Sequence, residues 1–251
     1  MSIISHVDGH IAALQINRPE TKNALTLEMY QHLADALNAY DRHEDIRVVV
    51  IHGLPEMFCA GNDLHDFLNN PPDISNSPVV DFLYALRDFS KPLVMAVNGA
   101  AVGIGVTMLL HADFVVIGDT ARLQLPFINL ALCPEGSSSL TLVQNGGYLR
   151  AAEKLMFGEA FTPQEAIALG VASHVMPASE VEQYAFHRAR QLAAKSPEAM
   201  RETKRLLKAP NGDRLRQVMD EEIATFSRLM AGAHAREAIT AFFEKRKPVF
   251  E

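Results

Sequence analysis

The chain has little cysteine, no tryptophan and no long hydrophobic run. Its 251 residues include two cysteines, Cys59 and Cys133, which are too few for a disulfide scaffold or a cysteine-rich metal cluster. No apolar run reaches the ~18 residues of a membrane helix, and no charged-then-apolar leader or C-terminal Ser-Lys-Leu address is visible. We therefore expect a cytoplasmic protein with no membrane partner and no metal site.

Positive charge is also scarce. Lysine and arginine number 23 against 30 aspartates and glutamates, which gives a formal net charge of −7. Proteins that bind nucleic acid neutralise phosphates with basic surfaces, so a nucleic-acid partner is not expected. The apolar content of 48% is ordinary for a globular protein, and the length suits one large domain or a large domain with a small appendage.

Short apolar runs that alternate with helical patterns predict an α/β fold. Buried strands are predicted at residues 11–16, 48–51, 93–97, 113–117 and 122–125, and helices at residues 26–41 and 79–89. Three times, an apolar strand gives way to a glycine or polar loop and then to a helix, which is typical of α/β proteins. Residues 53–63 are predicted to form a loop, and residues 69–78, rich in Asn, Pro and Ser, a surface segment.

The C-terminal part of the chain is predicted to be helical. Residues 197–246 indicate two or three helices and no strand, and Ser196 followed by proline and glutamate is a typical helix start. The most plausible division therefore separates a core of residues 1–195 from a helical region of residues 196–251.

Two glycine-bearing loops, residues 58–64 and 98–107, are candidates for binding an anionic oxygen. Gly61 leaves the N–H of Asn62 little shielded, and in the second loop two glycines flank Ile104 at a predicted helix start. The first N–H groups of a helix lack intrahelical partners, and two converging N–H groups stabilise a developing oxyanion. Close packing of a strand against a helix is the alternative explanation for these glycines.

Glu135 is the candidate proton carrier. It lies in the stretch Leu-Cys-Pro-Glu-Gly-Ser-Ser-Ser, residues 132–139. Apolar surroundings raise the pKa of a glutamate from its ordinary value of about 4.3 toward neutrality. An oxyanion site with a single base suits proton transfer next to a carbonyl, whereas adding water usually needs two acid–base groups. The same stretch is also a good turn before a helix capped by Ser137, so a structural role is the alternative.

Other residues are weaker candidates. His52, His65 and His111 show no metal-ligand spacing, and the two cysteines are more typical of buried small side chains. The glycines around Ile104 do not complete the dinucleotide-binding pattern Gly-x-Gly-x-x-Gly. Asp63 is interpreted as a brace for its own loop.

Taken together, the motifs resemble the enoyl-CoA hydratase/isomerase family of the crotonase superfamily. The resemblance covers nearly the whole chain: it begins at residues 17–25, runs through both glycine loops, continues over residues 158–172 and ends at residues 242–248. It implies a crotonase-like spiral of β-β-α units followed by a C-terminal helical region that trimerises. A homotrimer, or a hexamer built from two trimers, is therefore expected.

The resemblance also implies roles for individual residues. The N–H groups of Asn62 and Ile104 correspond to the oxyanion hole that holds a thioester oxygen. Lys245 lies near a C-terminal lysine that reaches a CoA in relatives, often the CoA of a neighbouring subunit. Residues 69–90 are expected to shape the acyl pocket. Five residues fall in segments that line the CoA moiety: Ala24, Leu25, Ala60, Asp63 and Leu64.

Departures from the hydratase pattern indicate which reaction to expect. Hydratases carry two catalytic glutamates, and the corresponding positions here hold Thr107 and, nearby, Phe127. The segment around Glu135 instead resembles the Pro-Glu-Gly segment of peroxisomal-type Δ3,Δ2-enoyl-CoA isomerases. The resemblance implies isomerisation of 3-enoyl-CoA to trans-2-enoyl-CoA with Glu135 as the only proton carrier and no cofactor apart from the CoA of the substrate.

Three alternatives stay open at this stage. The first is hydration of an enoyl-CoA. The second is another thioester-enolate reaction, such as decarboxylation or hydrolysis, because the same oxyanion hole serves all of them. The third is non-catalytic binding of acyl-CoA.

Overall fold

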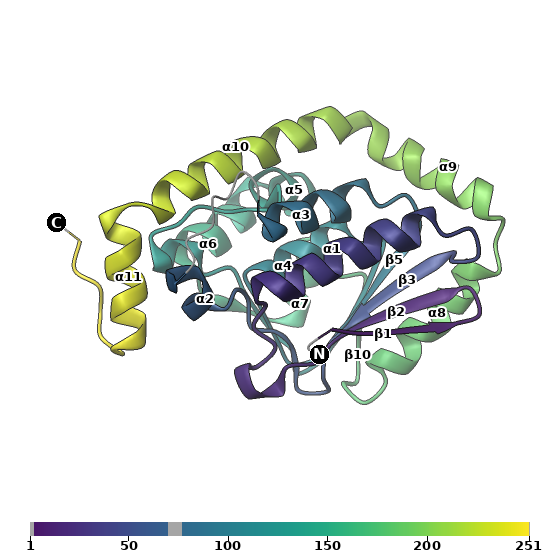
Figure 1. The fold of residues 1–251 in the computed structure, drawn as a ribbon, viewed down its shortest axis with the longest axis horizontal. Coiled ribbons are helices and arrows are strands. Elements are labelled where there is room, and N and C mark those ends of the chain that lie inside the picture. Colours follow the sequence, from purple (N-terminus) through teal and green to yellow (C-terminus); the bar gives the residue numbers. More distant parts are fainter. Residues whose placement is uncertain (1–2, 70–76, 251) are drawn as a thin grey trace.

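Two β-sheets form the core of the fold (Figure 1). The computed structural model describes residues 3–69 and 77–250. The larger sheet has six strands in the order β1-β2-β3-β5-β7-β10, and the smaller has four in the order β4-β6-β8-β9. The strands are β1 Ile3–Asp8, β2 Ile11–Ile16, β3 Val48–His52, β4 Met57–Cys59, β5 Leu93–Val97, β6 Ala100–Val102, β7 Phe114–Gly118, β8 Arg122–Gln124, β9 Ala160–Phe161 and β10 His174–Met176.

The strand order shows how a β-β-α unit repeats. In each of the pairs β3–β4, β5–β6 and β7–β8, the first strand enters the larger sheet and the second enters the smaller one. The first strands pair in parallel with one another, and so do the second strands. Three successive pairs of this kind, with helices following them, form the predicted spiral, so the expected fold class is confirmed.

Helices cover both faces of the larger sheet. The α-helices of the described ranges are α1 Leu27–Arg42, α2 Leu64–Asn69, α3 Pro78–Asp88, α4 Ile104–Thr107, α5 Ser138–Gly146, α6 Tyr148–Phe157, α7 Pro163–Ala168, α8 Val181–Ala193, α9 Pro197–Lys208, α10 Gly212–Met230 and α11 Ala233–Phe243. In β3, Val48 and Val50 pack in the same cluster as residues of α8, whereas Val49 and Ile51 join the core that contains α1 and α3. A strand buried on both faces reads as a continuous apolar run, which is why β3 was recognisable in the sequence.

The last three helices run over the core in succession. Figure 1 shows α9 and α10 along the top of the molecule and α11 turning down at its left side. The predicted boundary between residues 195 and 196 falls in the connection between α8 and α9. The helical content of this region is as predicted, whereas its status as a separate unit stays a prediction.

One local prediction was wrong. Residues 53–63 were expected to form a loop, but they contain the three-residue strand β4, and the second glycine loop likewise contains β6. Strands this short carry no readable alternation and are recognised only through their partners. Most of the predicted surface segment at residues 69–78 lies outside the described residues: α2 ends at Asn69 and α3 begins at Pro78.

Across the described ranges, no helix is long and apolar enough to span a membrane. No group of three or more His, Cys, Asp or Glu side chains in these ranges is arranged to hold a metal ion. Both cysteines are free thiols.

Candidate active site

The two glycine loops meet at one edge of the smaller sheet. Strands β4 and β6 are parallel neighbours, with Met57 opposite Ala100, so the loops that follow them emerge side by side. The contact is close enough to need glycine: a Cβ on Gly105 would lie 2.7 Å from the carbonyl oxygen of Cys59. Gly61, at φ +96°, adopts a left-handed conformation, and its Cβ would lie 3.2 Å from the oxygen of Val102. The glycines therefore permit this approach of the two loops.

The main-chain N–H groups of Asn62 and Ile104 are left out of the local hydrogen bonding. Asn62 forms an isolated parallel β-bridge with Leu25. The two hydrogen bonds of this bridge are made by the neighbours of Asn62: the Leu25 N–H donates to the Gly61 oxygen at 2.8 Å, and the Asp63 N–H donates to the Leu25 oxygen at 2.9 Å. Ile104 is the first residue of α4, where an N–H has no intrahelical acceptor. Neither N–H group donates to another of the described residues, so both are open to a ligand there.

The side chain of Asn62 is fixed by Tyr30. The Tyr30 hydroxyl, on α1, donates a hydrogen bond to Oδ1 of Asn62. Burial raises the pKa of Tyr30 well above its ordinary value, and the nearby Cys59 and Glu135 raise it further, so the hydroxyl keeps its proton and remains a donor.

Glu135 is buried against the second glycine loop. It is 8% exposed, and Oε1 accepts a hydrogen bond from the hydroxyl of Thr107, the last residue of α4. Its other oxygen, Oε2, is buried and has no hydrogen-bond partner among the described residues. An unpaired buried carboxylate oxygen is costly in free energy, which is a pattern expected where a group must react rather than stabilise the fold.

The surroundings of Glu135 raise its pKa. Burial raises the value most, the hydrogen bond from Thr107 lowers it, and repulsion by Glu222 raises it again, with a net result of about 8. The group therefore titrates near neutral pH and can both take up and release a proton there. The sequence prediction that apolar neighbours would raise this pKa agrees with the structure.

Glu222, from α10, is the second buried glutamate near this loop. Its carboxylate accepts hydrogen bonds from the N–H groups of Ser137, at 2.6 Å, and Ser139, at 2.9 Å. These N–H groups belong to the start of α5, so Glu222 serves as its N-terminal cap from a distant helix. The long helix α10 is thereby attached to the segment that carries Glu135.

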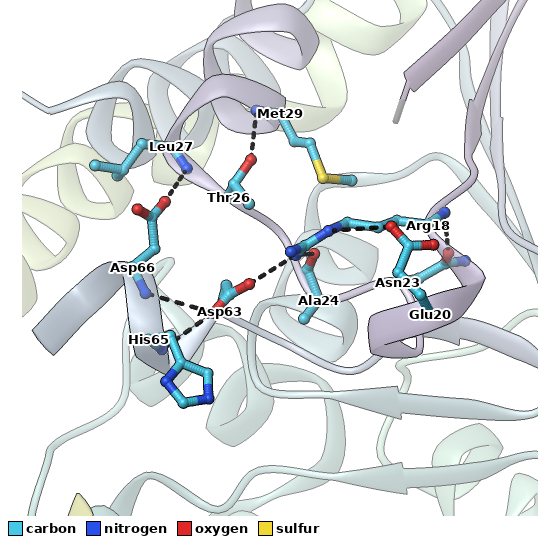
Figure 2. Close-up of polar contacts among 10 residues, drawn as sticks. All are labelled: Arg18, Glu20, Asn23, Ala24, Thr26, Leu27, Met29, Asp63, His65 and Asp66. Atoms are coloured by element: carbon cyan, nitrogen blue, oxygen red, sulfur yellow. Dashed lines mark hydrogen bonds and ion pairs between the residues drawn. The ribbon is translucent and has the colours of Figure 1, made fainter. Parts of the chain in front are cut away.

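The predicted CoA-binding segments pair with each other beside this site. Figure 2 shows the guanidinium of Arg18 between Asp63 and the main chain of Ala24, at 2.7 Å from Oδ2 of Asp63 and 2.9 Å from the Ala24 oxygen. The other oxygen of Asp63 accepts hydrogen bonds from the N–H groups of His65 and Asp66. Although burial alone raises its pKa, Arg18 and these N–H groups hold the pKa of Asp63 below its ordinary value.

The remaining predicted CoA residues lie in or near the same region. The Ala60 N–H donates to the Lys22 oxygen at 3.1 Å, two residues before Ala24, and Leu64 begins α2. Lys245 follows α11, whose Phe243 ring lies 4.5 Å from the ring of His65. The chain therefore brings its C-terminal lysine segment to the same side as the paired loops.

The two hydratase positions carry no carboxylate in the structure. Thr107 donates to Glu135, and Phe127 is buried against Gly103 and the ring of Phe226. From the sequence, Thr107 was notable only because it stands where hydratases carry a glutamate. Its role as a hydrogen-bond donor to Glu135 required the three-dimensional contact.

Sequence reasoning missed several supporting residues. Tyr30 was a member of an apolar helix face, and Glu222 was an unremarkable position in a charged helix. Asn23 is fully buried, and its amide group donates to the main-chain oxygens of Ile16, Met57 and Phe58. Asn23 lies in the motif at residues 17–25, but its hydrogen bonds were not foreseen. No motif or local spacing singles out Tyr30 and Glu222, because their partners are more than 30 positions away.

The architecture is that of a crotonase-type α/β protein. An enoyl-CoA hydratase/isomerase from Pseudoalteromonas atlantica superimposes with a TM-score of 0.95 over 100% of both chains, at 35% identity. A family model described as enoyl-CoA hydratase/isomerase matches residues 6–251. The chain therefore belongs to the enoyl-CoA hydratase/isomerase family.

Curated relatives include both isomerases and hydratases. Enoyl-CoA delta isomerase 2 of Rattus norvegicus is 35% identical over 96% of this chain, which spans 63% of the length of that relative. The 2,3-dehydroadipyl-CoA hydratase of Escherichia coli is 33% identical, and the match covers 96% of this chain and 95% of the length of the hydratase. Family membership alone therefore does not identify the reaction.

Proposed function

We propose that the protein isomerises a 3-enoyl-CoA to the trans-2-enoyl-CoA in acyl-CoA degradation. The single observation that carries this proposal is the buried Glu135, whose free oxygen and raised pKa make it a proton carrier beside two unengaged N–H groups. The isomerase relatives support the same assignment.

The proposed mechanism moves one proton. The thioester oxygen binds between the N–H groups of Asn62 and Ile104. Ionised Glu135 takes a proton from carbon 2, the C2–H electrons form a dienolate whose charge rests on the thioester oxygen, and the protonated Glu135 then returns its proton to carbon 4. Preorganised N–H donors of this kind typically contribute about 3–4 kcal/mol each to the transition state. Thr107 holds Glu135 by one oxygen, which leaves the other for the substrate.

Hydration is the less favoured reaction because it needs a group to activate water and a second group to deliver a proton. The residues at both hydratase positions, Thr107 and Phe127, cannot do this. Glu222 is not a substitute, since both of its carboxylate oxygens accept main-chain N–H groups of α5.

CoA is proposed to bind along the paired segments that contain Ala24, Leu25, Ala60, Asp63 and Leu64, with Lys245 reaching a CoA of its own or a neighbouring subunit. The reaction is redox-neutral, so no cofactor is proposed beyond the CoA of the substrate. Free thiols at both cysteines support a reducing location, for which we propose the cytoplasm.

A homotrimer, or a hexamer of two trimers, is the proposed assembly. Helix α6 presents a set of large apolar side chains to solvent, of which Leu149 is 83% exposed: Tyr148, Leu149, Met156 and Phe157. Several exposed large apolar side chains on one helix are typical of a subunit interface. Sedimentation analysis of the purified protein gives the number of subunits directly.

The decisive experiment follows the fate of the proton. Purified protein is incubated with trans-3-enoyl-CoA thioesters of short, medium and long chains, and the conjugated enoyl thioester is followed by ultraviolet absorbance. Substrate deuterated at carbon 2 is expected to give product with deuterium at carbon 4, detected by mass spectrometry, because the same carboxyl group removes and returns it. Solvent exchange during the shuttle lowers this yield.

Other outcomes would assign a different reaction. Formation of 3-hydroxyacyl-CoA from a trans-2-enoyl-CoA would identify a hydratase. Release of free CoA or carbon dioxide would identify a hydrolase or decarboxylase. Binding of acyl-CoA without any turnover would leave a non-catalytic role.

A further inference from the structure

A separate cavity of about 560 Å³ lies between α3, α5, α9 and α10. None of the residues predicted to form the oxyanion hole or to bind CoA lines it. His111 does line it, and the Nε2 atom of His111 lies 2.8 Å from the Gly136 oxygen, so the cavity adjoins the segment that carries Glu135. Its volume is in the range of sites for small organic ligands.

The charge of the cavity is opposite to that of the whole chain. Its lining contains two carboxylates, Asp88 and Asp213, in a protein whose formal net charge is −7. Six basic side chains also line it: Arg87, Arg201, Lys204, Arg205, Lys208 and Arg216. A concave basic site in an acidic protein concentrates anions locally.

Carboxylates of the protein neutralise only part of this positive charge. Arg87 pairs with Asp88 at 2.6 Å, Lys204 with Asp113 at 2.6 Å and Arg205 with Glu202 at 2.8 Å. The other three cations, Arg201, Lys208 and Arg216, form no ion pair with any of the described residues.

Lys208 is the most informative of the three. Its Nζ donates to the Arg87 main-chain oxygen at 3.0 Å, which satisfies a hydrogen bond but not a charge. Burial lowers the pKa of Lys208 most and repulsion by Lys204 lowers it further, whereas the nearby Asp113 and Asp88 raise it, with a net result of about 8. Holding like charges together in a partly buried site is unfavourable unless a counter-ion offsets the repulsion.

We propose that this cavity binds a small molecule bearing two or more negative charges on phosphate groups. The unpaired cations come from two helices, α9 and α10, so one singly charged ion cannot satisfy them all. Arginine and lysine together are well suited to phosphate, whose oxygens accept several charge-assisted hydrogen bonds. The bound anion would join α9 and α10 to α3 through Lys208.

The test is calorimetric titration with inorganic pyrophosphate at constant ionic strength. Inorganic phosphate and ADP are the parallel ligands: tighter binding of ADP indicates a nucleotide, and tighter binding of pyrophosphate indicates recognition of the phosphates alone. The double variant Arg201→Gln/Arg216→Gln removes two exposed, unpaired cations and is expected to weaken binding about tenfold or more. Lys208→Gln tests the partly buried cation separately.

Two control variants make the result specific. Arg214→Gln removes an arginine from α10 that lies outside the cavity lining, and binding should change less than about twofold. Lys245→Gln should also leave pyrophosphate binding unchanged. Loss of binding in Lys245→Gln would place the anion at the CoA segments and overturn the proposal. Equal loss in Arg214→Gln, or no binding of any phosphate ligand to the wild type, would overturn it as well.

Discussion

Asp63 and Glu135 lie in adjacent parts of the candidate site, and their surroundings are opposite. Asp63 has a guanidinium on one oxygen and two main-chain N–H groups on the other, and its pKa is lowered. Glu135 has one hydroxyl donor, one unpaired oxygen and a raised pKa of about 8. Full pairing stabilises the ionised form of a carboxylate, which can then hold a loop in place. A buried carboxylate with incomplete pairing has a raised pKa and can exchange a proton near neutral pH.

The largest expected difference between the two residues is in turnover. Glu135→Gln keeps the size and the oxygen that accepts from Thr107 but cannot carry a proton, so kcat should fall by about 10³-fold, while KM changes little. Asp63→Asn weakens the pairing with Arg18 and should raise KM for the acyl-CoA while kcat stays within a few-fold of the wild type. Steady-state kinetics with a trans-3-enoyl-CoA measure both constants.

Near wild-type turnover by Glu135→Gln would show that Glu135 is not the base. A 10³-fold loss of kcat in Asp63→Asn would mean that the contrast between the two residues is wrong, because a bracing residue should not govern the chemical step.

The same two substitutions should have opposite effects on stability. The folded pKa of Glu135 lies above its unfolded value of 4.5, so its contribution to stability is full below pH 4.5 and is lost as pH rises through about 8. Glu135→Gln should therefore be more stable than the wild type at pH 9, by on the order of 3 kcal/mol, and little different at pH 4.

The contribution of Asp63 to stability depends on pH in the opposite direction. Its folded pKa is lowered, so its stabilisation is present above the ordinary pKa and is lost as pH falls through the folded value. Asp63→Asn should therefore be destabilised at pH 7 and above by about 2 kcal/mol. Denaturant unfolding of both variants at pH 4, 7 and 9 checks the two signs, and a parallel response of the two variants would contradict the comparison.

Much of the fold, and the outline of the candidate site, could be predicted from the sequence. The apolar runs at β2, β3 and β5 are local signals, as is the capping threonine Thr26, which accepts from the Met29 N–H at 3.3 Å. The glycines indicated the two loops, and the resemblance added the order of the motifs and the expected roles of Asn62 and Ile104. Asp63 was also correctly interpreted as a brace.

The remainder depended on contacts between distant segments. Strand β4 is three residues long and exists because β6 lies beside it. Thr107 and Glu135 are 28 positions apart, and Glu222 reaches its partners from 83 and 85 positions away. No sequence periodicity encodes such pairs, so the environment of Glu135 could be predicted as apolar but not its donor, its free oxygen or the second carboxylate.

A smaller effect should appear in the pH dependence of kcat/KM. Since the base acts ionised, the rate should rise with pH toward a plateau above about 8. Glu222→Gln removes a repelling charge and should move this rise to lower pH, whereas Thr107→Val removes a donor and should move it to higher pH, each by about half a unit to one unit. Glu221→Gln, at the exposed neighbouring position, is the matched control and should leave the profile unchanged. Shifts of the same sign in Glu222→Gln and Thr107→Val would contradict this account of the raised pKa.

The smallest expected effect concerns Tyr30, which positions Asn62 without touching the reacting atoms. Tyr30→Phe keeps the buried ring and removes the hydroxyl that donates to Oδ1 of Asn62, so the N–H of Asn62 should be less well oriented toward the thioester oxygen. Because a slightly misplaced donor loses only part of its stabilisation of the transition state, kcat should fall about three- to tenfold with KM nearly unchanged. Tyr84→Phe, which removes a hydroxyl bonded to Asp220 at 2.5 Å on α10, serves as the control and should leave kcat unaltered. A change confined to the unfolding midpoint would assign Tyr30 to the stability of the fold, whereas a change in kcat alone links α1 to the oxyanion loop.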